Sequence, residues 1–584
     1  MPQCLRARGG ALRVHANRSS GASRTAALLG AEAAEPERAP DEGWPDHAER
    51  NLTNSAPAAS QRNILAGRRG PPHWILFVLF AGGAIGAAIS LLLYSTAPAY
   101  VALLPFGGAL LLPTLFLKNF RLYWLALFLL SLQFTASKNL NDGLAVVDAL
   151  NIGNTDITGD QYYTIHNFTF EITATDLALL MLCVIWINDA LFHNKSLIFP
   201  AVGWLAVGYL GLALLSIVGS RSPYLGLVEM SRQLKFFIVF LFAVNCLDSK
   251  GVIRLLAIVC VVTLVVQAGV TLLRVKTGYY TPFSFGDFHQ DVDQIEKYLS
   301  VDRSNPDSMV RGYGTLGSPG GTVRLCTLMF PFALFLCFPN AMFKRRSAFA
   351  ALAAFSLVGL VFTSDRVYFI TTAVQLVLVF SIMLRDRVMK RDEAIAILMI
   401  SLIAVITVGP KLYYQFTVRQ DSLSVRLLQY EAATNMIIAH PFLGVGLNNT
   451  MDQKRDYLNL TYYPNDPDTH FYQESTHNMY LSMASEIGIL ATLLFVAFFA
   501  NATVVAWRQS RGSPDPEIRL AANALFVAFC SAALNSMMDP LAETPLLTLL
   551  WLYAGISLNL SRMAQTSQIE PAPAALGYGV SRPA

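Results

Sequence analysis

A polar stretch that opens directly into a long apolar run contains the residue with the clearest chemical potential, His477. The stretch Ser475-Thr476-His477-Asn478 precedes the run Met479–Ala500. Ser475 or Thr476 can cap the helix that this run predicts. His477 would then lie at a helix N-terminus, where backbone N–H groups and the helix dipole favour an anion. On these residues alone, a histidine in a polar loop at the membrane surface, without a catalytic role, remains the alternative.

Arg366 lies in a second position suited to anion binding. It ends Thr363-Ser364-Asp365-Arg366, a very short connection between two apolar runs. An arginine held in a tight turn at the membrane surface can bind a phosphate, because its planar guanidinium matches the phosphate oxygens. The alternative is an arginine that only reaches toward the interface, with its charge neutralised by Asp365.

A third segment, Ser422–Ala439, carries Arg426 and predicts an amphipathic helix lying on the membrane. The residues at helical spacing are Leu423, Leu427, Tyr430, Ala433, Thr434, Ile437 and Ile438. His440-Pro441 ends the helix, and Gly444-Val445-Gly446 forms a glycine turn. A G-x-G pattern suggests a phosphate loop only after a strand in a βαβ unit, which this context excludes. We therefore reject nucleotide binding for this turn.

The elements that must position these residues are membrane helices. Hydrophobic residues make up 54% of the chain and charged residues only 14%, whereas soluble domains carry about 25% charged residues. The apolar residues form blocks of the length that crosses a bilayer as a helix, and the alternation of a β-barrel is absent. The blocks predict an all-α polytopic membrane protein with about 14 transmembrane helices. They include Ile75–Tyr94, Ala97–Leu117, Leu122–Thr135, Leu177–Phe192, Gly203–Val218, Phe236–Cys246, Leu255–Leu273, Ala348–Phe362, Val367–Leu384, Ala394–Val408, Met479–Ala500, Leu520–Met537 and Pro545–Leu560.

Positive charge predicts the orientation of these spans, because short cytoplasmic loops are enriched in Lys and Arg. The short connections with the densest positive charge are Lys344–Arg346, Arg385–Arg391 and Arg508–Arg519. With these three in the cytoplasm, Arg68-Arg69 and Arg562 also fall there, so both termini are expected to be cytoplasmic. The long polar segments Lys138–Ile172, Val275–Gly321 and Leu412–Thr476 then all lie outside.

This topology divides the chain into five parts. Residues 1–70 are rich in Ala, Arg, Ser, Pro and Glu and have no apolar span, so we expect a disordered cytoplasmic extension. Its arginine-rich, acid-free start also resembles a transit peptide. The remaining parts are transmembrane helices in 71–411 with extracytoplasmic loops at 136–172 and 274–321, a large extracytoplasmic loop at 412–476 with its amphipathic helix, C-terminal transmembrane helices at 477–562, and a cytoplasmic tail at 563–584.

Neither a metal site nor a cofactor is expected. The seven cysteines show no metal-ligand spacing and none lies in an outside loop, so they indicate neither a zinc site nor a disulfide framework. Asp466, Asp468 and His470 lie close together, but in a Pro-rich stretch. The formal charge of +4 does not point to a nucleic-acid partner.

Three segments, in this order, resemble the signature of the O-antigen ligase and polymerase superfamily. They are Ser364-Asp365-Arg366, then Ser424-Val425-Arg426 continuing to His440-Pro441-Phe442-Leu443-Gly444-Val445-Gly446, and then His477-Asn478-Met479-Tyr480-Leu481 with Glu486-Ile487-Gly488. Arg311-Gly312-Tyr313-Gly314-Thr315, leading to Ser318-Pro319, is similar to the family's segment before its central span. The resemblance extends roughly over residues 200–560. It implies a GT-C-type multi-helix transferase that moves a glycan from undecaprenyl diphosphate to an acceptor hydroxyl without a metal.

The resemblance also implies roles for particular residues. Arg366 and Arg426 match the family's two diphosphate-binding arginines, and His477 matches the histidine that receives the acceptor. Fixed guanidinium groups can stabilise the negative charge of a departing diphosphate, and imidazole is suited to accept a hydroxyl proton near neutral pH. Arg311 and Glu486, in two of the matching segments, are candidate accessory residues. The expected partners are an undecaprenyl-diphosphate-linked glycan donor, a saccharide acceptor and membrane lipid, with no nucleic acid.

The sequence departs from the family's pattern in three places. Asp365 stands where many relatives have a small residue, Gly317–Gly321 lacks the usual Pro-Asn pair, and Tyr279–Val310 resembles an insertion. These departures bear on the identity of glycan and acceptor. The long outer loops and the insertion favour a polymerase of exopolysaccharide or O-antigen repeats over a lipopolysaccharide ligase. A protein O-oligosaccharyltransferase is a further alternative, and in each case we expect a multi-pass protein of the bacterial cell inner membrane with its active site on the periplasmic face.

A polysaccharide or lipid transporter, or flippase, is the alternative from another functional class. Transporters tend to show internal repeats and ionisable residues at mid-membrane. The sequence shows no repeat, and Asp176, Asp189, Asp539 and Glu543 fall near the ends of predicted spans. Glu486 is the exception within a span, so the residues favour a transferase over a transporter.

Overall fold

The computed structural model describes residues 120–133, 136–139, 170–192, 196–277, 285–286, 312–316, 318–337, 346–363, 365–387, 421–458, 476–539 and 544–569. The expected disorder of residues 1–70 lies outside this range. So do the predicted spans Ile75–Tyr94, Ala97–Leu117 and Ala394–Val408, and so does Arg311.

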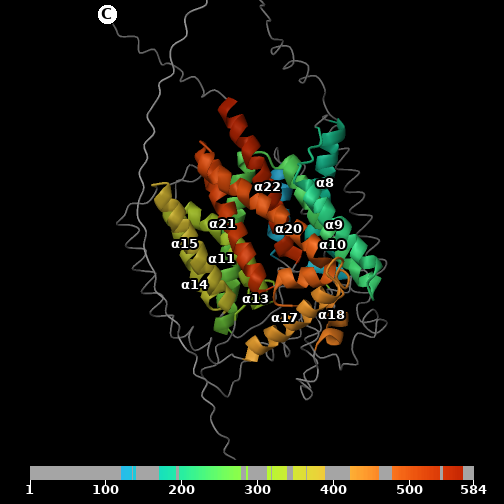
Figure 1. The fold of residues 1–584 in the computed structure, drawn as a ribbon. Coiled ribbons are helices and arrows are strands. Elements are labelled where there is room, and N and C mark those ends of the chain that lie inside the picture. Colours follow the sequence, from blue (N-terminus) through green and yellow to red (C-terminus); the bar gives the residue numbers. More distant parts are fainter. Residues whose placement is uncertain are drawn as a thin grey trace, which may run out of the picture. The chain divides into compact units, whose positions relative to one another are not determined.

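The described part is a bundle of helices (Figure 1). The helices are α5 (Phe120–Ser131), α8 (Ala174–Phe192), α9 (Gly203–Val218), α10 (Pro223–Cys246), α11 (Lys250–Thr277), α13 (Pro319–Leu336), α14 (Arg346–Val361), α15 (Arg366–Arg385), α17 (Asp421–Ala439), α18 (Thr450–Gln453), the 3-10 helix η3 (Lys454–Tyr457), α20 (Met479–Gly512), α21 (Pro516–Met538) and α22 (Thr544–Ile569). Within the described residues, seven of these helices are long and apolar enough to cross a membrane: α8, α11, α13, α15, α20, α21 and α22. The chain is therefore an all-α polytopic membrane protein, and the total of about 14 helices remains a prediction.

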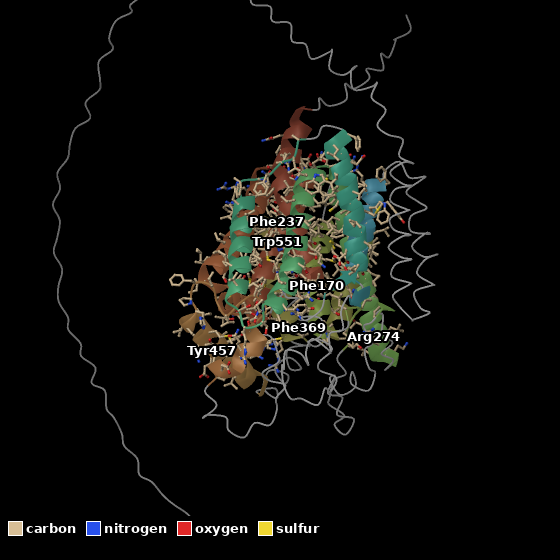
Figure 2. The ribbon with its side chains drawn as sticks, turned by 90° about the vertical axis from the view of Figure 1, so that its right-hand side faces the viewer. Phe170, Phe237, Arg274, Phe369, Tyr457 and Trp551 are labelled. Carbon is tan, nitrogen blue, oxygen red and sulfur yellow. The ribbon has the colours of Figure 1, made fainter. Side chains whose placement is uncertain are left out.

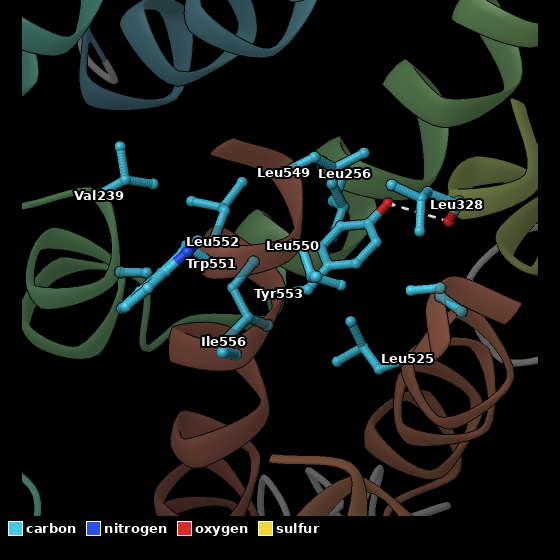
Figure 3. Close-up of a cluster of buried hydrophobic side chains, with 14 of the residues drawn as sticks. Val239, Leu256, Leu328, Leu525, Leu549, Leu550, Trp551, Leu552, Tyr553 and Ile556 are labelled. Carbon is cyan, nitrogen blue, oxygen red and sulfur yellow. Dashed lines mark hydrogen bonds between the residues drawn. The ribbon is translucent and has the colours of Figure 1, made fainter. Parts of the chain in front are cut away.

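Helix α22 forms the centre of the packing. It lies against α10, α20 and α21, and Trp551 and Tyr553 on it are fully buried. Figure 3 shows these rings among leucine and isoleucine side chains of α22 itself and leucine and valine side chains of neighbouring helices, with the Tyr553 hydroxyl donating to the Leu328 carbonyl at 3.4 Å. The Trp551 ring also contacts Phe237, and both are labelled in Figure 2. In a membrane, such close packing of complementary surfaces holds helices together.

Helix α10 carries charged residues through the bundle. Glu229 accepts hydrogen bonds from Arg232 at 3.1 Å and from Gln233 at 2.7 Å, and Gln233 in turn accepts one from Tyr209 of α9 at 2.9 Å. These polar groups satisfy one another, so Arg232 and Gln233 can remain buried although the first half of the helix is not apolar. The sequence prediction of a short span, Phe236–Cys246, captured only the second half of this helix.

Buried polar side chains also join α13, α15 and α21. The Gln375 amide of α15 donates to the Thr327 carbonyl of α13 at 2.5 Å and to the Ser531 hydroxyl of α21 at 2.8 Å. The Asn535 amide of α21 donates to the Thr327 hydroxyl at 2.7 Å. Hydrogen bonds between helices are favourable where little water competes for the same groups. The Asn535 bond fixes α21 relative to α13 about one turn before the end of α21 at which the candidate site lies.

A small three-stranded sheet accompanies the helices, with strand order β2-β1-β3. The strands are β1 (Ala136–Asn139), β2 (Glu171–Thr173) and β3 (Phe285–Gly286). β1 pairs antiparallel with β2, with Ser137 opposite Thr173, and parallel with β3. The apolar and polar patterns of the sequence do not predict these strands. Phe170, labelled in Figure 2, precedes β2 and contacts the Tyr224 ring at the start of α10, which ties the sheet to the bundle.

Helix α21 runs from one end of the bundle to the other, and each of its ends carries an acidic residue that contacts basic groups. At its beginning, Glu517 forms a two-bond ion pair with Arg254 near the start of α11, at 2.6 and 3.1 Å. At its other end lies Asp539, next to α17 and to the first residues of α13 and α20. His477 and Arg426, which were singled out in the sequence, lie at this second end, which Figure 1 shows with α17 and α18.

Candidate active site

His477 lies two residues before the start of helix α20 and is held by its backbone. Asn478, rather than Ser475 or Thr476, is the N-cap: its side-chain oxygen accepts from the N–H groups of Tyr480 and Leu481 at 3.0 and 3.1 Å. The expectation of a capping residue was correct, but its position was wrong, because the helix begins at Met479 and the cap is the residue directly before it.

Helix α17 fixes both backbone groups of His477. The His477 N–H donates to the Gln429 side-chain oxygen at 3.2 Å, and its carbonyl accepts from the Tyr430 hydroxyl at 2.8 Å. Gln429 is buried and α17 packs against α20. The segment predicted as an amphipathic helix thus presents two polar side chains that position the histidine.

The imidazole of His477 contacts the carboxylate of Asp539. The distance from Nδ1 to Oδ1 is 2.5 Å, and the two side chains are 28% and 15% exposed. An ionised carboxylate only accepts hydrogen bonds, so Nδ1 carries the hydrogen and donates it. This fixes the ring orientation and directs Nε2 away from the carboxylate.

Two arginines lie around Asp539. The Arg324 Nη1 is 3.8 Å from Oδ2, and the Arg426 Nη1 donates to the carbonyl of the preceding residue, Met538, at 3.1 Å. Burial by itself raises the pKa of Asp539. The positive charge of Arg324, the hydrogen bond and charge of His477 and the charge of Arg426 outweigh that effect and hold the pKa below its usual value. Asp539 is therefore an anion at neutral pH.

Arg366 is the first residue of α15, a helix that packs against both α13 and α21. Asp365 is the N-cap of α15, and its carboxylate accepts from the Val367 N–H at 2.9 Å. This explains a carboxylate at a position where a small residue was expected, since Asp is a favoured N-cap. Arg366 thus begins a helix next to the one that carries Arg324.

Glu486 belongs to a different polar cluster. Its carboxylate accepts from the Thr450 hydroxyl at 2.7 Å and from the Asn448 N–H at 3.1 Å, and Lys454 is buried nearby. These contacts fasten the segment after the glycine turn to α20. Of the two candidate accessory residues, Glu486 makes these contacts with the segment after the turn, and Arg311 lies outside the described residues.

The glycine turn packs against a break in α20 and forms hydrogen bonds with the backbone there. Gly488 has φ +82° and interrupts the helix. The N–H groups of Val445 and Gly446 donate to the carbonyls of Ser485 and Glu486 at 2.8 and 2.9 Å, and the Ile489 N–H donates to the carbonyl of Pro441 at 2.9 Å. The turn thus supplies partners for backbone groups that the break leaves without helical ones. This backbone docking accounts for the G-x-G pattern without a phosphate.

His440 takes no part in the His477 cluster. Its Nε2 lies 2.9 Å from the hydroxyl of Tyr457, which Figure 2 shows at the α17–α18 end of the molecule. Asn435 donates to the carbonyl of the same tyrosine at 2.9 Å. His440 therefore fastens η3 to the end of α17.

Asp539 and Arg324 are the residues that sequence reasoning missed. Asp539 had been noted only as an acid near a span end, and Arg324 lies within an apolar run. Neither stands in a local pattern that points to His477. A charge at the end of an apolar block was the one available signal, and it identifies no partner.

Comparison with known proteins identifies a family. Residues 317–496 match the family model described as O-antigen ligase. The matching region contains Arg324, Arg366, Arg426 and His477, and it ends before Asp539. No curated protein matches the sequence. A chain from a solved structure of a peptidoglycan synthase complex aligns with 63% of this chain and 98% of its own length, at 14% identity and a TM-score of 0.34.

Proposed function

We propose that this chain is a glycosyltransferase that uses a lipid-diphosphate donor, and the match of residues 317–496 to the O-antigen ligase family model supports this proposal. In this proposal it moves a glycan from undecaprenyl diphosphate to a hydroxyl of a saccharide acceptor. The product is a cell-surface polysaccharide, either O-antigen or exopolysaccharide. The observation that carries the proposal is the contact between His477 and Asp539 with arginines on both sides.

His477 is the general base of the proposed reaction. Its Nδ1–H is bound to Asp539, so Nε2 accepts the proton of the acceptor hydroxyl. Asp539 holds the ring in this tautomer and stabilises the imidazolium that forms, as the carboxylate does in a Ser-His-Asp triad. The proton later passes from the imidazolium to water, which restores the base.

Arg366 and Arg426 bind the donor diphosphate. As the acceptor oxygen attacks the anomeric carbon, the bond from that carbon to the diphosphate oxygen breaks, and the diphosphate leaves with the electron pair. Negative charge grows on the leaving group, and fixed guanidinium groups stabilise it without reorganisation. These groups supply the positive charge that the departing diphosphate needs, so we expect full activity in the presence of EDTA.

The proposed site is on the periplasmic face of the bacterial inner membrane. The charge distribution supports this placement, because the positively charged connections Lys344–Arg346, Arg385–Arg391 and Arg508–Arg519 fall together on the opposite side of the predicted topology. The choice between polymerase and ligase depends on the long outer loops and on the insertion-like segment Tyr279–Val310, which favour a polymerase. Deleting the gene and resolving the surface polysaccharide on a gel tests this choice. Single repeat units would indicate a lost polymerase, and intact polymer left on the carrier lipid a lost ligase.

Purified protein in liposomes tests the reaction class. The assay supplies a lipid-diphosphate-linked glycan and a saccharide acceptor and follows the covalent attachment of the glycan by mass spectrometry. A transferase produces a new glycosidic bond and free lipid diphosphate. Movement of an unaltered lipid-linked glycan across the bilayer, without transfer, would instead establish a flippase and refute the proposal.

A further inference from the structure

Asp539 lies between the imidazole of His477, just before α20, and the guanidinium of Arg324 on α13. Its Oδ1 contacts the His477 Nδ1 at 2.5 Å, and its Oδ2 faces the Arg324 Nη1 at 3.8 Å. The Arg324 side chain is 12% exposed, and its Nε–H donates to the Gly320 carbonyl in the first turn of α13 at 3.0 Å. The guanidinium is therefore anchored, and little water screens it from the carboxylate.

This arrangement affects the proton affinity of the histidine. A carboxylate beside an imidazole favours the protonated ring, which cannot act as a base. A fixed guanidinium on the other side of the same carboxylate opposes that effect through its own positive charge. Among the described residues, the titratable or charged side chains near the His477–Asp539 pair include Arg324 from α13, Arg426 and Tyr430 from α17, and Tyr480, three residues after His477 in α20.

We propose that Arg324 is a positioning residue of the transferase site: it keeps Asp539 ionised and oriented toward His477, and it keeps His477 unprotonated at neutral pH. The inference rests on the proposed function and adds to it a residue that acts through Asp539. Arg426 also contributes positive charge, but Arg324 has the more direct access to the carboxylate, because Arg426 bonds to the carbonyl of Met538.

The pH dependence of the reaction tests this role. In liposomes, kcat/KM for the wild type is measured from about pH 5 to about pH 9, a range that covers histidine titration. For Arg324→Gln, the acid limb of the profile is expected to move to higher pH by about one unit, with activity recovering at alkaline pH. Arg324→Lys keeps the charge and should leave the limb nearly in place. A guanidinium with only a structural role would lower activity equally at every pH and leave the limb unmoved, and that result would overturn the proposal.

Arg254→Gln is the matched control. Arg254 also pairs with a carboxylate, Glu517, but at the opposite end of α21. The pH profile of kcat/KM for Arg254→Gln should coincide with that of the wild type. If Arg324→Gln does not yield folded protein, Arg324→Met keeps a long stem without the charge and carries the same expectation. If only Arg324→Lys folds, a shifted limb in that variant would refute the inference.

A second readout does not depend on turnover. Diethyl pyrocarbonate modifies unprotonated imidazole, so the pH dependence of His477 modification, followed by mass spectrometry, reports its protonation directly. The modification curve of His477 should move to higher pH in Arg324→Gln, while that of His440 stays in place. If the wild type transfers no glycan at any pH but the His477 curve shifts, the proposed function fails and the effect of Arg324 stands. If transfer occurs and neither curve nor limb shifts, the inference fails and the function stands.

Discussion

His477, which precedes α20, and Asp539, which ends α21, are 62 residues apart in the chain and are joined by a contact of 2.5 Å. Both lie at the same end of two helices that pack along each other. Any change in the packing of α20 on α21 therefore alters the orientation of the proposed base. The two residues should behave as one functional unit.

Substitution of either residue tests that unit. His477→Ala and Asp539→Asn should each lower kcat by about 10²- to 10⁴-fold, the range for loss of a general base or its orientation. The double variant should be no slower than His477→Ala, because groups that act together are not additive. Donor binding should be nearly unchanged in all three. His440→Gln is the control, since His440 contacts Tyr457 instead, and it should keep most of its activity. A fully active, well-folded His477→Ala variant would falsify the mechanism.

Conservative changes at the two arginines test the diphosphate site. Arg366→Lys and Arg426→Lys should raise KM and lower kcat, because the ground-state diphosphate is already charged and a lysine cannot form the same planar pair of bonds. A loss of about tenfold or more in donor binding is expected for each. Arg221→Lys, in an exposed ion pair with Asp456, is the matched control. If both variants bound the donor as tightly as the wild type, the diphosphate site would have to lie elsewhere.

Thiol labelling in intact spheroplasts tests the orientation. A cysteine in place of Glu431, exposed on α17, should react with an impermeant maleimide. A cysteine in place of Arg508, exposed near the end of α20, should react only after permeabilisation. The wild type, which contains seven cysteines, supplies the background. The reverse pattern would place the candidate site in the cytoplasm.

Gly488→Ala tests the break in α20. At φ +82° an L-residue is strained, and its Cβ would lie 2.0 Å from the Phe442 carbonyl oxygen. Strain of this kind costs about 1–3 kcal/mol before the steric clash is counted. The detergent-solubilised variant should therefore unfold at a markedly lower temperature. Gly512→Ala, at the end of the same helix, has open space around its Cβ and should unfold like the wild type. Equal stability of the two variants would contradict the docking of the glycine turn.

Acid should destabilise the protein partly through Asp539. Its pKa is lower in the folded protein than in a free chain. Its stabilising contribution is therefore complete above the unfolded value of about 3.9 and is lost as the pH falls through the folded value. The unfolding temperature of Asp539→Asn should lie below that of the wild type at pH 7, and the gap should narrow as the pH falls toward about 3. If the unfolding temperatures of the two proteins kept the same difference at every pH, the ionised Asp539 carboxylate would not be stabilised by its neighbours.

The apolar blocks predicted the described helices well, because crossing a bilayer requires long apolar runs. The bounds predicted for one span, Gly203–Val218, are those of α9. The prediction for α10 was too short, because Glu229, Arg232 and Gln233 satisfy one another inside the bundle. Such mutual satisfaction depends on three-dimensional contacts, and a count of apolar residues cannot detect it.

The candidate site was only partly predictable. His477, Arg366 and Arg426 were identified because each stands at the end of an apolar run or on a periodic segment within a recognisable order of motifs. Asp539 and Arg324 could not be assigned, since their significance arises only when the ends of α13, α20 and α21 meet. The role of the glycine turn in pairing the backbone of α20 depends on the break at Gly488, a backbone angle that the sequence does not reveal.

The break in α20 also bears on how the protein is made. An α20 that entered the bilayer alone with this break would carry unpaired carbonyls at Ser485 and Glu486, and each such group costs several kcal/mol in hydrocarbon. The residues that pair with them, Pro441–Gly446, come earlier in the chain and leave the ribosome first. Translation order therefore delivers the complementary segment before the helix that needs it. A circular permutant that places residues 421–458 after α22 would reverse this order, and its yield of correctly inserted protein should fall even if its final contacts were the same.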